Sequence, residues 1–190
     1  MVRIDIVAFD GMDELDAVGP LEVLRRADFD VKLVAFEPSI TCAYGLTLTP
    51  DGDPRNDVDI VIFPGGGWVS RAAKGVRAEI DTGRWNALIE ETKSRGAILA
   101  SVCTGAMILS AAGALRGRRA TTHHGAWADL EAAGATLVRE RVVDDGDRVT
   151  AGGVTSGIDL GLWLVERFSG RESAERIAAN LEYRPAGQAC

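Results

Sequence analysis

Cys103 is the residue of this 190-residue chain whose surroundings are best suited to chemistry. It follows an apolar run at residues 97–102 that is typical of a buried strand, and it precedes a helical pattern at 104–112. A cysteine at such a turn points its sulfur out of the fold, and the N–H groups of the helix's first turn favour the thiolate. Ser101 and Gly105 are small, as a cramped turn requires. The pattern predicts a nucleophile, and the alternative is the inert buried filler that many free cysteines are.

A glycine run, Pro64-Gly65-Gly66-Gly67-Trp68, follows another strand pattern at residues 59–63. Ligands of open parallel sheets bind beyond the carboxyl ends of the strands, so this loop belongs to the same edge as Cys103. Glycine lets backbone amides approach a ligand closely, and these N–H groups, with that of Thr104, could stabilise negative charge beside the sulfur. A plain turn is the alternative. The run lacks the Lys-Ser or Lys-Thr of a Walker phosphate loop.

Four carboxylates, Asp10, Asp13, Glu14 and Asp16, crowd the loop after the first strand pattern. Most carboxylates in such a loop are solvated or cap a helix. Asp16 differs because apolar residues lie on both sides of it. A half-buried carboxyl beside a cysteine can stay protonated and donate a hydrogen bond to the thiolate, or it can accept a proton from an attacking water.

The chain's two histidines, His123 and His124, are adjacent. Adjacent side chains on a strand or helix cannot both face one metal ion, and no Cys-x-x-Cys or His-Glu-x-x-His spacing is present, so no metal site is predicted. We expect a structural or surface role for His124. His123, at the end of a short strand, is the candidate to approach Cys103.

The bulk composition excludes some classes of partner. The formal net charge is −7, and the basic residues are scattered, apart from Arg116, Arg118 and Arg119, which fit a solvated turn. Nucleic acid and anionic membranes are therefore not expected as partners. No apolar stretch has the length of a bilayer span, and the first residues enter a strand pattern without a signal-peptide layout. We expect a cytoplasmic protein.

The remaining cysteines do not form a disulfide framework. The chain has three cysteines in all, without a paired spacing. Cys42, in a predicted hairpin, is expected to be packed filler, and Cys190 a frayed end.

Alternating strand and helix patterns predict an α/β fold with a doubly wound, mostly parallel sheet. Near-continuous apolar runs at residues 4–9, 31–36, 60–63 and 98–102 are typical of strands buried on both faces. Helices are expected at 20–27, 85–95, 104–115, 127–133, 156–168 and 172–182, the first with Pro20 at its first position. Hairpins are expected at 40–48 and between 136–143 and 148–151. One domain over residues 1–190 accommodates all of this.

Five motifs, in order along nearly the whole chain, resemble the DJ-1/PfpI superfamily. They are Leu15-Asp16-Ala17-Val18-Gly19-Pro20, Phe63-Pro64-Gly65-Gly66-Gly67, Ser101-Val102-Cys103-Thr104-Gly105-Ala106, Ala120-Thr121-Thr122-His123 and Gly152-Gly153-Val154-Thr155-Ser156-Gly157-Ile158-Asp159. Within the superfamily the chain looks most similar to the isocyanide hydratases, also called isonitrile hydratases, and to the amidase-like domains of AraC-type regulators.

The resemblance implies a flavodoxin-like fold, similar to class I glutamine amidotransferases, with helices on both sides of the sheet, and usually a homodimer. It implies that Cys103 is the nucleophile, Asp16 its acidic partner and Thr104 a further catalytic residue. Gly66 would face Thr104 across the pocket and, with Gly67 and His123, bind the substrate or a developing oxyanion. The resemblance implies neither a metal nor an organic cofactor.

Departures from the family pattern narrow the activity. PfpI-type proteases have a histidine after the cysteine, where this chain has Thr104, so peptide hydrolysis would lack its general base. DJ-1 and its glyoxalase relatives have a glutamate where this chain has Asp16, and aspartate is the hydratase-like choice. The His123-His124 pair differs from the His-Trp of close hydratases, and Trp68 follows the glycines, so the substrate pocket is expected to differ.

The expected activity is hydration of an isocyanide to an N-substituted formamide through a thioimidate on Cys103, with Asp16 positioning the water. The enzymatic alternative is a DJ-1-like glyoxalase or deglycase. The non-catalytic alternative is a redox or ligand sensor in which Cys103 is oxidised. A DNA-binding regulator is not expected, because the chain has one domain and an acidic composition.

Overall fold

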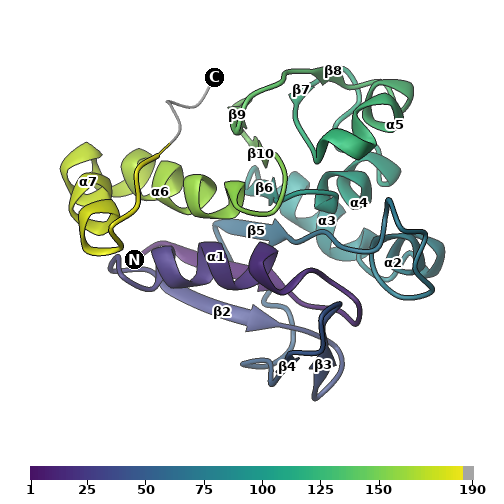
Figure 1. Cartoon of the computed structure of the whole chain (residues 1–190), viewed down its shortest axis with the longest axis horizontal. Coiled ribbons are helices and arrows are strands. Elements are labelled where there is room, and N and C mark those ends of the chain that lie inside the picture. Colours follow the sequence, from purple (N-terminus) through teal and green to yellow (C-terminus); the bar gives the residue numbers. More distant parts are fainter. Residues whose placement is uncertain (186–190) are drawn as a thin grey trace.

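A six-stranded sheet forms the centre of the computed structural model, which describes residues 1–185 (Figure 1). Its strand order is β2-β1-β5-β6-β10-β9, and all neighbours pair in parallel except β10 with β9. The strands are β1 (Arg3–Val7), β2 (Asp30–Val34), β5 (Ile60–Phe63), β6 (Ile98–Ser101), β9 (Val142–Asp144) and β10 (Arg148–Ala151). Most residues of the apolar runs are buried because helices cover both faces of the sheet, as predicted, although Phe36 at the end of the second run is 50% exposed.

The strand order explains why helices lie on both faces of the sheet. The crossover from β1 to β2 runs in the opposite direction along the sheet from that between β5 and β6, so right-handed connections place their helices on opposite faces. One face carries α1 (Glu14–Leu24), α6 (Ser156–Ser169) and α7 (Arg171–Asn180), which pack together (Figure 1). The other carries α2 (Val76–Thr82), α3 (Asn86–Ser94) and α4 (Gly105–Ala111). The fold is flavodoxin-like.

The first helix begins earlier than its proline suggests. α1 starts at Glu14, and Pro20 lies inside it, so the predicted start at Pro20 is wrong. Asp13 is the N-cap, and its side chain accepts a hydrogen bond from Leu15 N–H. The missing N–H of Pro20 removes one helical hydrogen bond, and its ring packs against α6 at Gly157, where an added Cβ would lie 3.0 Å from Pro20 Cδ. The early start places Asp16 on a helix.

Smaller elements differ in part from the predictions. The hairpin of β3 (Ile40–Thr41) and β4 (Thr47–Leu48) is confirmed, as is pairing of β9 with β10. The strand predicted over 136–143 is divided: β8 (Thr136–Leu137) pairs in parallel with β7 (Arg119–Ala120) in a separate sheet. The helix α2 was not predicted. The 127–133 region forms α5 (Trp127–Ala132), preceded by the 3₁₀ turn η1 (His124–Ala126).

Cys42 and Cys190 are the two cysteines outside the elbow. Cys42 is buried, 4% exposed, in keeping with packed filler. Cys190 lies outside the described residues. Within residues 1–185, no helix combines the length and apolar character needed to cross a bilayer.

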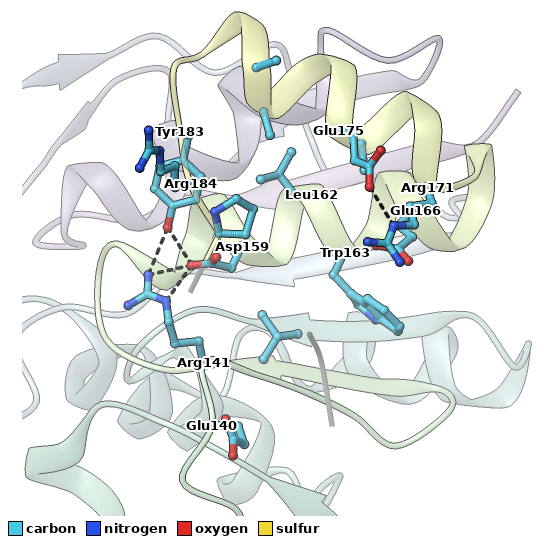
Figure 2. A pocket seen from close by; sticks show the side chains of 15 residues that line it. Glu140, Arg141, Asp159, Leu162, Trp163, Glu166, Arg171, Glu175, Tyr183 and Arg184 are labelled. Carbon is cyan, nitrogen blue, oxygen red and sulfur yellow. Dashed lines mark hydrogen bonds and ion pairs between the residues drawn. The ribbon is translucent and has the colours of Figure 1, made fainter. Parts of the chain in front are cut away.

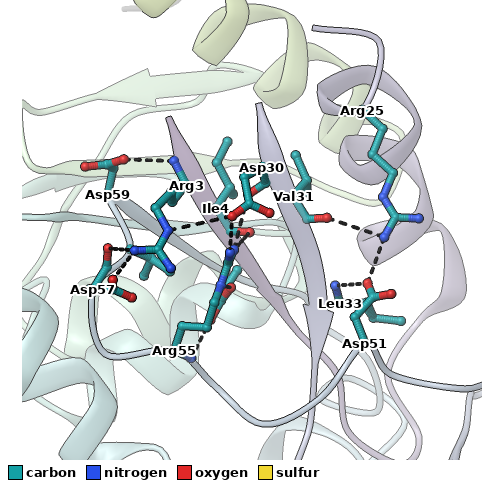
Figure 3. A network of polar contacts seen from close by, with 12 residues as sticks. Arg3, Ile4, Arg25, Asp30, Val31, Leu33, Asp51, Arg55, Asp57 and Asp59 are labelled. Carbon is teal, nitrogen blue, oxygen red and sulfur yellow. Dashed lines mark hydrogen bonds and ion pairs between the residues drawn. The ribbon is translucent and has the colours of Figure 1, made fainter. Parts of the chain in front are cut away.

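A buried ion-pair network lies at the end of the sheet where β1 and β2 begin (Figure 3). Asp5 on β1 is fully buried, and both of its oxygens accept hydrogen bonds from Arg55, at 2.7 Å from Nε and 2.8 Å from the backbone N–H. The Arg55 guanidinium also pairs with Asp30 and donates to the Ile4 carbonyl at 2.9 Å. One guanidinium therefore connects β1, β2 and the loop before β5.

Replacing Arg55 with methionine is expected to destabilise the protein by about 3–5 kcal/mol, because it leaves the Asp5 carboxyl buried without its partner. Urea unfolding of wild type and variant measures the change. Arg25→Met is the control: Arg25 pairs with Asp51 at 2.7 Å, but both side chains are more than 40% exposed, so we expect a loss below about 1 kcal/mol. Equal losses in the two variants would contradict this account.

Candidate active site

The elbow predicted at Cys103 is present as a strained turn between β6 and α4. Cys103 has a φ of 54°, in the left-handed region that costs a non-glycine residue about 1–3 kcal/mol. Its N–H donates to the carbonyls of Ala151 and Gly152, at 3.1 and 2.8 Å, and its carbonyl accepts the Thr122 hydroxyl at 2.8 Å. Contacts from two other segments therefore hold the turn in this conformation.

Gly105 satisfies a steric requirement of the elbow. A Cβ at this position would lie 2.0 Å from the Phe63 carbonyl oxygen, so no side chain fits where α4 passes the end of β5. Ser101, on the other side of Cys103, is fully buried. The small residues seen in the sequence therefore allow close packing of the turn against the neighbouring strand.

The Cys103 sulfur is less exposed and less acidic than the sequence suggested. The residue is only 6% exposed. Burial first, and then the charge of the nearby Asp16, raise the pKa of the Cys103 thiol to about 12, against the opposing effect of hydrogen bonds from the N–H groups of Val154 and Thr104. Burial therefore opposes the thiolate that the helix N-terminus was expected to favour, because desolvation acts against these two N–H groups.

Asp16 lies beside Cys103, as expected, and is fully buried. Its Oδ2 accepts the Gly65 N–H at 2.8 Å, whereas its buried Oδ1 has no hydrogen-bond partner of good geometry within residues 1–185. Burial, followed by the charge of Asp13, raises the pKa of Asp16 to about 8, although Gly65 and Cys103 oppose the shift. Asp16 is therefore protonated at neutral pH, and the proton belongs on Oδ1 because Oδ2 is already an acceptor.

The glycine run connects Asp16 to the elbow. Gly66 N–H donates to Thr104 Oγ1 at 3.0 Å, so Gly66 and Thr104 face each other as expected. A Cβ on Gly65 would lie 2.5 Å from Thr104 N, and one on Gly66 would lie 2.5 Å from Asp13 N. The Gly65 and Gly66 N–H groups donate to Asp16 and Thr104, and these bonds hold the site together. The two N–H groups are therefore not free to bind an oxyanion, contrary to our expectation.

Gly67, His123 and His124 lie around the site without bonding to the sulfur. Gly67 has a φ of 73°, in the left-handed region. His123 Nδ1 accepts the Gly125 N–H at 3.1 Å, which leaves the proton of the neutral ring on Nε2. Burial, followed by the charge of His124, lowers the pKa of His123. Among the described residues no hydrogen bond joins His123 to Cys103, so roles for Gly67 and His123 in binding remain predictions.

Trp68 is held by polar contacts at the end of the glycine run. Its indole Nε1 donates to Asp129 on α5 at 2.7 Å, and the Arg77 guanidinium lies 3.8 Å from the ring centroid. Trp68 therefore forms a fixed wall between this loop and α5.

Sequence reasoning missed the role of the loop between β10 and α6. Val154 donates its N–H to the Cys103 sulfur and has a φ of 22°. Gly153 lies against His123, since a Cβ there would be 2.9 Å from His123 Cδ2. The Gly152-Gly153 pair signals a tight loop, but nothing in the sequence says that the following N–H points at the sulfur.

Two hollows lie on the surface, and Cys103 is not among the residues that line them. The larger, of about 450 Å³, lies between α6 and α7 and is lined by Leu162, Trp163 and the bonded trio Arg141, Asp159 and Tyr183 (Figure 2). A second, of about 350 Å³, borders Thr122, Gly152 and Gly153. Within residues 1–185, no group of three or more His, Cys, Asp or Glu residues is arranged to hold a metal ion.

Cys103 lies on a strained strand-to-helix turn, beside a protonated carboxyl at the carboxyl edge of a flavodoxin-like sheet. This arrangement defines a class of α/β proteins that are built around a nucleophile elbow. The model of the DJ-1/PfpI family matches residues 2–167. The chain belongs to the DJ-1/PfpI family.

Named relatives include enzymes. An isonitrile hydratase of Pseudomonas putida is 34% identical over 189 residues, covering 97% of this chain and 80% of that protein. A deglycase of Thermococcus kodakarensis is 30% identical over 156 residues, covering 79% of this chain and 89% of that protein. Among solved structures, a ThiJ/PfpI family protein from Pseudomonas syringae superposes with a TM-score of 0.86 at 30% identity, over 98% of this chain and 76% of that one.

Proposed function

We propose that the chain is an enzyme similar to isonitrile hydratase, which converts an isocyanide, R–N≡C, to the N-substituted formamide with Cys103 as nucleophile. The observation that carries the proposal is the pairing of a buried Cys103 thiol with a protonated Asp16 whose Oδ1 has no protein partner of good geometry within the described chain. The similarity to an isonitrile hydratase over most of both chains supports it.

The protonation states suit the first step. Sulfur adds to the terminal carbon of the isocyanide, and that carbon also gains a proton, giving the thioimidate R–N=CH–S–Cys103. Asp16 gives its Oδ1 proton to the carbon and receives the proton of the thiol, so the step needs both groups protonated at the start. A slender, linear –N≡C group also suits a nucleophile on a residue that is only 6% exposed.

Thr104 keeps the reacting groups aligned. Its hydroxyl accepts the Gly66 N–H and its own N–H donates to the Cys103 sulfur. Because Gly65 holds Asp16 Oδ2, the Gly65-Gly66 backbone couples the position of the acid to that of the nucleophile. Water then hydrolyses the thioimidate beside Asp16 and releases the formamide and the thiol.

The test is incubation with a simple aryl isocyanide, with the N-aryl formamide measured by chromatography. We expect turnover without added metal or organic cofactor. If no formamide forms, the proposal fails. Loss of methylglyoxal in the same preparation would favour the glyoxalase or deglycase alternative, for which the similarity to a deglycase is the support. Selective peroxide oxidation of Cys103 in an otherwise inactive protein would favour the sensor.

We also propose that the protein is a homodimer in the cytoplasm, as the resemblance to its family suggests. Support for a contact near the site comes from three exposed apolar side chains, Leu15, Tyr44 and Leu46, which are 38%, 84% and 46% exposed. They are held together because Glu14 accepts the N–H groups of Tyr44 and Leu46. Sedimentation equilibrium measures the mass, and a value near the 20.2 kDa of one chain would contradict the dimer.

A further inference from the structure

We propose that Asp13 is the base that accepts the proton of the hydrolytic water when the thioimidate on Cys103 is resolved. The inference rests on the proposed function and adds a second carboxyl with a separate task.

Asp16 is poorly placed to activate water. It is fully buried, and one of its oxygens is committed to Gly65 N–H. It is also protonated at neutral pH, since its pKa is raised to about 8, and a carboxylic acid cannot take a proton from water. Asp16 can protonate the substrate, but hydrolysis needs an ionised group nearby.

Asp13 lies against the same glycine backbone that holds the elbow. Its N–H donates to the Gly65 carbonyl at 2.9 Å, and its nitrogen is so close to Gly66 that a Cβ there would lie 2.5 Å away. On the elbow side, a Cβ on Gly65 would lie 2.5 Å from Thr104 N. The two glycines carry no side chain that would stand between Asp13 and the elbow.

The Asp13 carboxyl is half-buried, and one of its oxygens remains available. Oδ1 caps α1 by accepting the Leu15 N–H at 3.2 Å, whereas Oδ2 accepts no hydrogen bond from any residue between 1 and 185. Its charge acts on both Cys103 and Asp16, whose pKa values it raises. A half-buried carboxylate with a free oxygen, close enough for its charge to act on the nucleophile, is the arrangement that a water-activating base needs.

The charges that face Asp13 adjust its basicity. Burial is the main cause that raises the pKa of Asp13, and Glu14 on the same helix adds to it. His123, from the segment before η1, acts in the opposite direction. Beyond these, Asp13 influences Cys42 in the β3–β4 hairpin, whose pKa burial raises to about 11. Asp13 is therefore a stronger base than a solvated aspartate.

The hydrolysis then balances. The water oxygen bonds to the thioimidate carbon, its proton goes to Asp13, and the imine nitrogen takes the proton of Asp16, giving R–NH–CH(OH)–S–Cys103. When this adduct collapses, the hydroxyl proton returns to Asp16, the C–S bond breaks, and the sulfur takes the proton from Asp13. The products are R–NH–CHO and the Cys103 thiol, with both carboxyls in their starting states.

Asp13→Asn tests the role, because asparagine keeps the N-cap and removes the base. We expect kcat for formamide release to fall at least about 10²-fold, while the rate of thioimidate formation in a single turnover changes less than about threefold. Intact-mass measurement should find Cys103 carrying the mass of the isocyanide. The wild-type kcat should decline at acid pH as Asp13 is protonated, and the variant should lose this decline.

The matched control is Glu14→Gln, which removes the neighbouring charge and should retain wild-type turnover. Asp13→Ser also keeps an N-cap side chain for α1. If Asp13→Asn is poorly folded, Asp13→Ser should show the same accumulation of the thioimidate on Cys103. Normal kcat without accumulated adduct in a folded Asp13 variant overturns this inference alone. Absence of both adduct and formamide with the wild type overturns the proposed function and the inference with it.

Discussion

Replacing Cys103 with alanine is expected to reduce formamide production from an aryl isocyanide by at least about 10³-fold, because no other thiol lies on the elbow. The covalent adduct seen by intact mass should disappear with it. The substitution should leave folding intact, since alanine fits the space of the cysteine and the bonds to Ala151 and Gly152 come from the backbone.

Cys42→Ala is the matched control for this result. Cys42 is the other free cysteine within the described residues, and it is also buried. It lies in the β3–β4 hairpin, so its loss should leave turnover close to the wild-type value. Residual turnover in a folded Cys103→Ala protein, or a matching loss in a folded Cys42→Ala protein, would remove Cys103 from the mechanism.

The second large effect is a dependence on pH set by Asp16. Activity should fall as pH rises through about 8, since the first step needs the protonated carboxyl. Asp16→Asn can donate a hydrogen bond but cannot transfer a proton, so we expect a loss of about 10²–10⁴-fold in kcat/KM. Initial rates from pH 6 to pH 10, at fixed ionic strength, measure the profile. A rate that keeps rising beyond pH 9 would contradict a role for the neutral acid.

The same carboxyl should make stability fall with rising pH. The folded-state pKa of about 8 exceeds the unfolded value of about 3.9, so folding takes up a proton. The stabilisation is fully present below about pH 4 and is lost progressively up to about pH 8, with a total on the order of a few kcal/mol. Asp16→Asn should flatten this part of the curve in urea unfolding, and an unchanged slope would show that Asp16 is ionised in the folded protein.

More of the fold than of the active site could be predicted from the sequence. Apolar strands alternating with helical patterns gave the parallel sheet, because burial on both faces leaves a signature in residue type. The start of α1 was misplaced because Pro20 resembles a first helical residue, whereas the real cap is Asp13. Residues 136–143 alternate like one strand, yet β8 and β9 belong to different sheets, since pairing depends on contacts distant in sequence.

At the site, residue identity was predictable but protonation was not. The elbow at Cys103 and its approach to Asp16 follow from local sequence and from the edge of the sheet to which both belong. The pKa values of the pair depend on burial by the whole fold, which opposes the local helix N-terminus. The contact from Val154 N–H could not be foreseen either, because a backbone donor leaves no mark on the side chains.

The Arg55 network and the Cys103 elbow lie at opposite ends of the strands. This separation determines which substitutions can alter substrate specificity without lowering stability. Loops at the carboxyl end can be altered to admit a different substrate while Asp5, Arg55 and Asp30 keep β1 and β2 in register. Conversely, stabilising substitutions at the amino end leave the reacting groups untouched. In directed evolution of new specificities, stabilising substitutions at the amino end can therefore compensate for destabilising substitutions in the active-site loops.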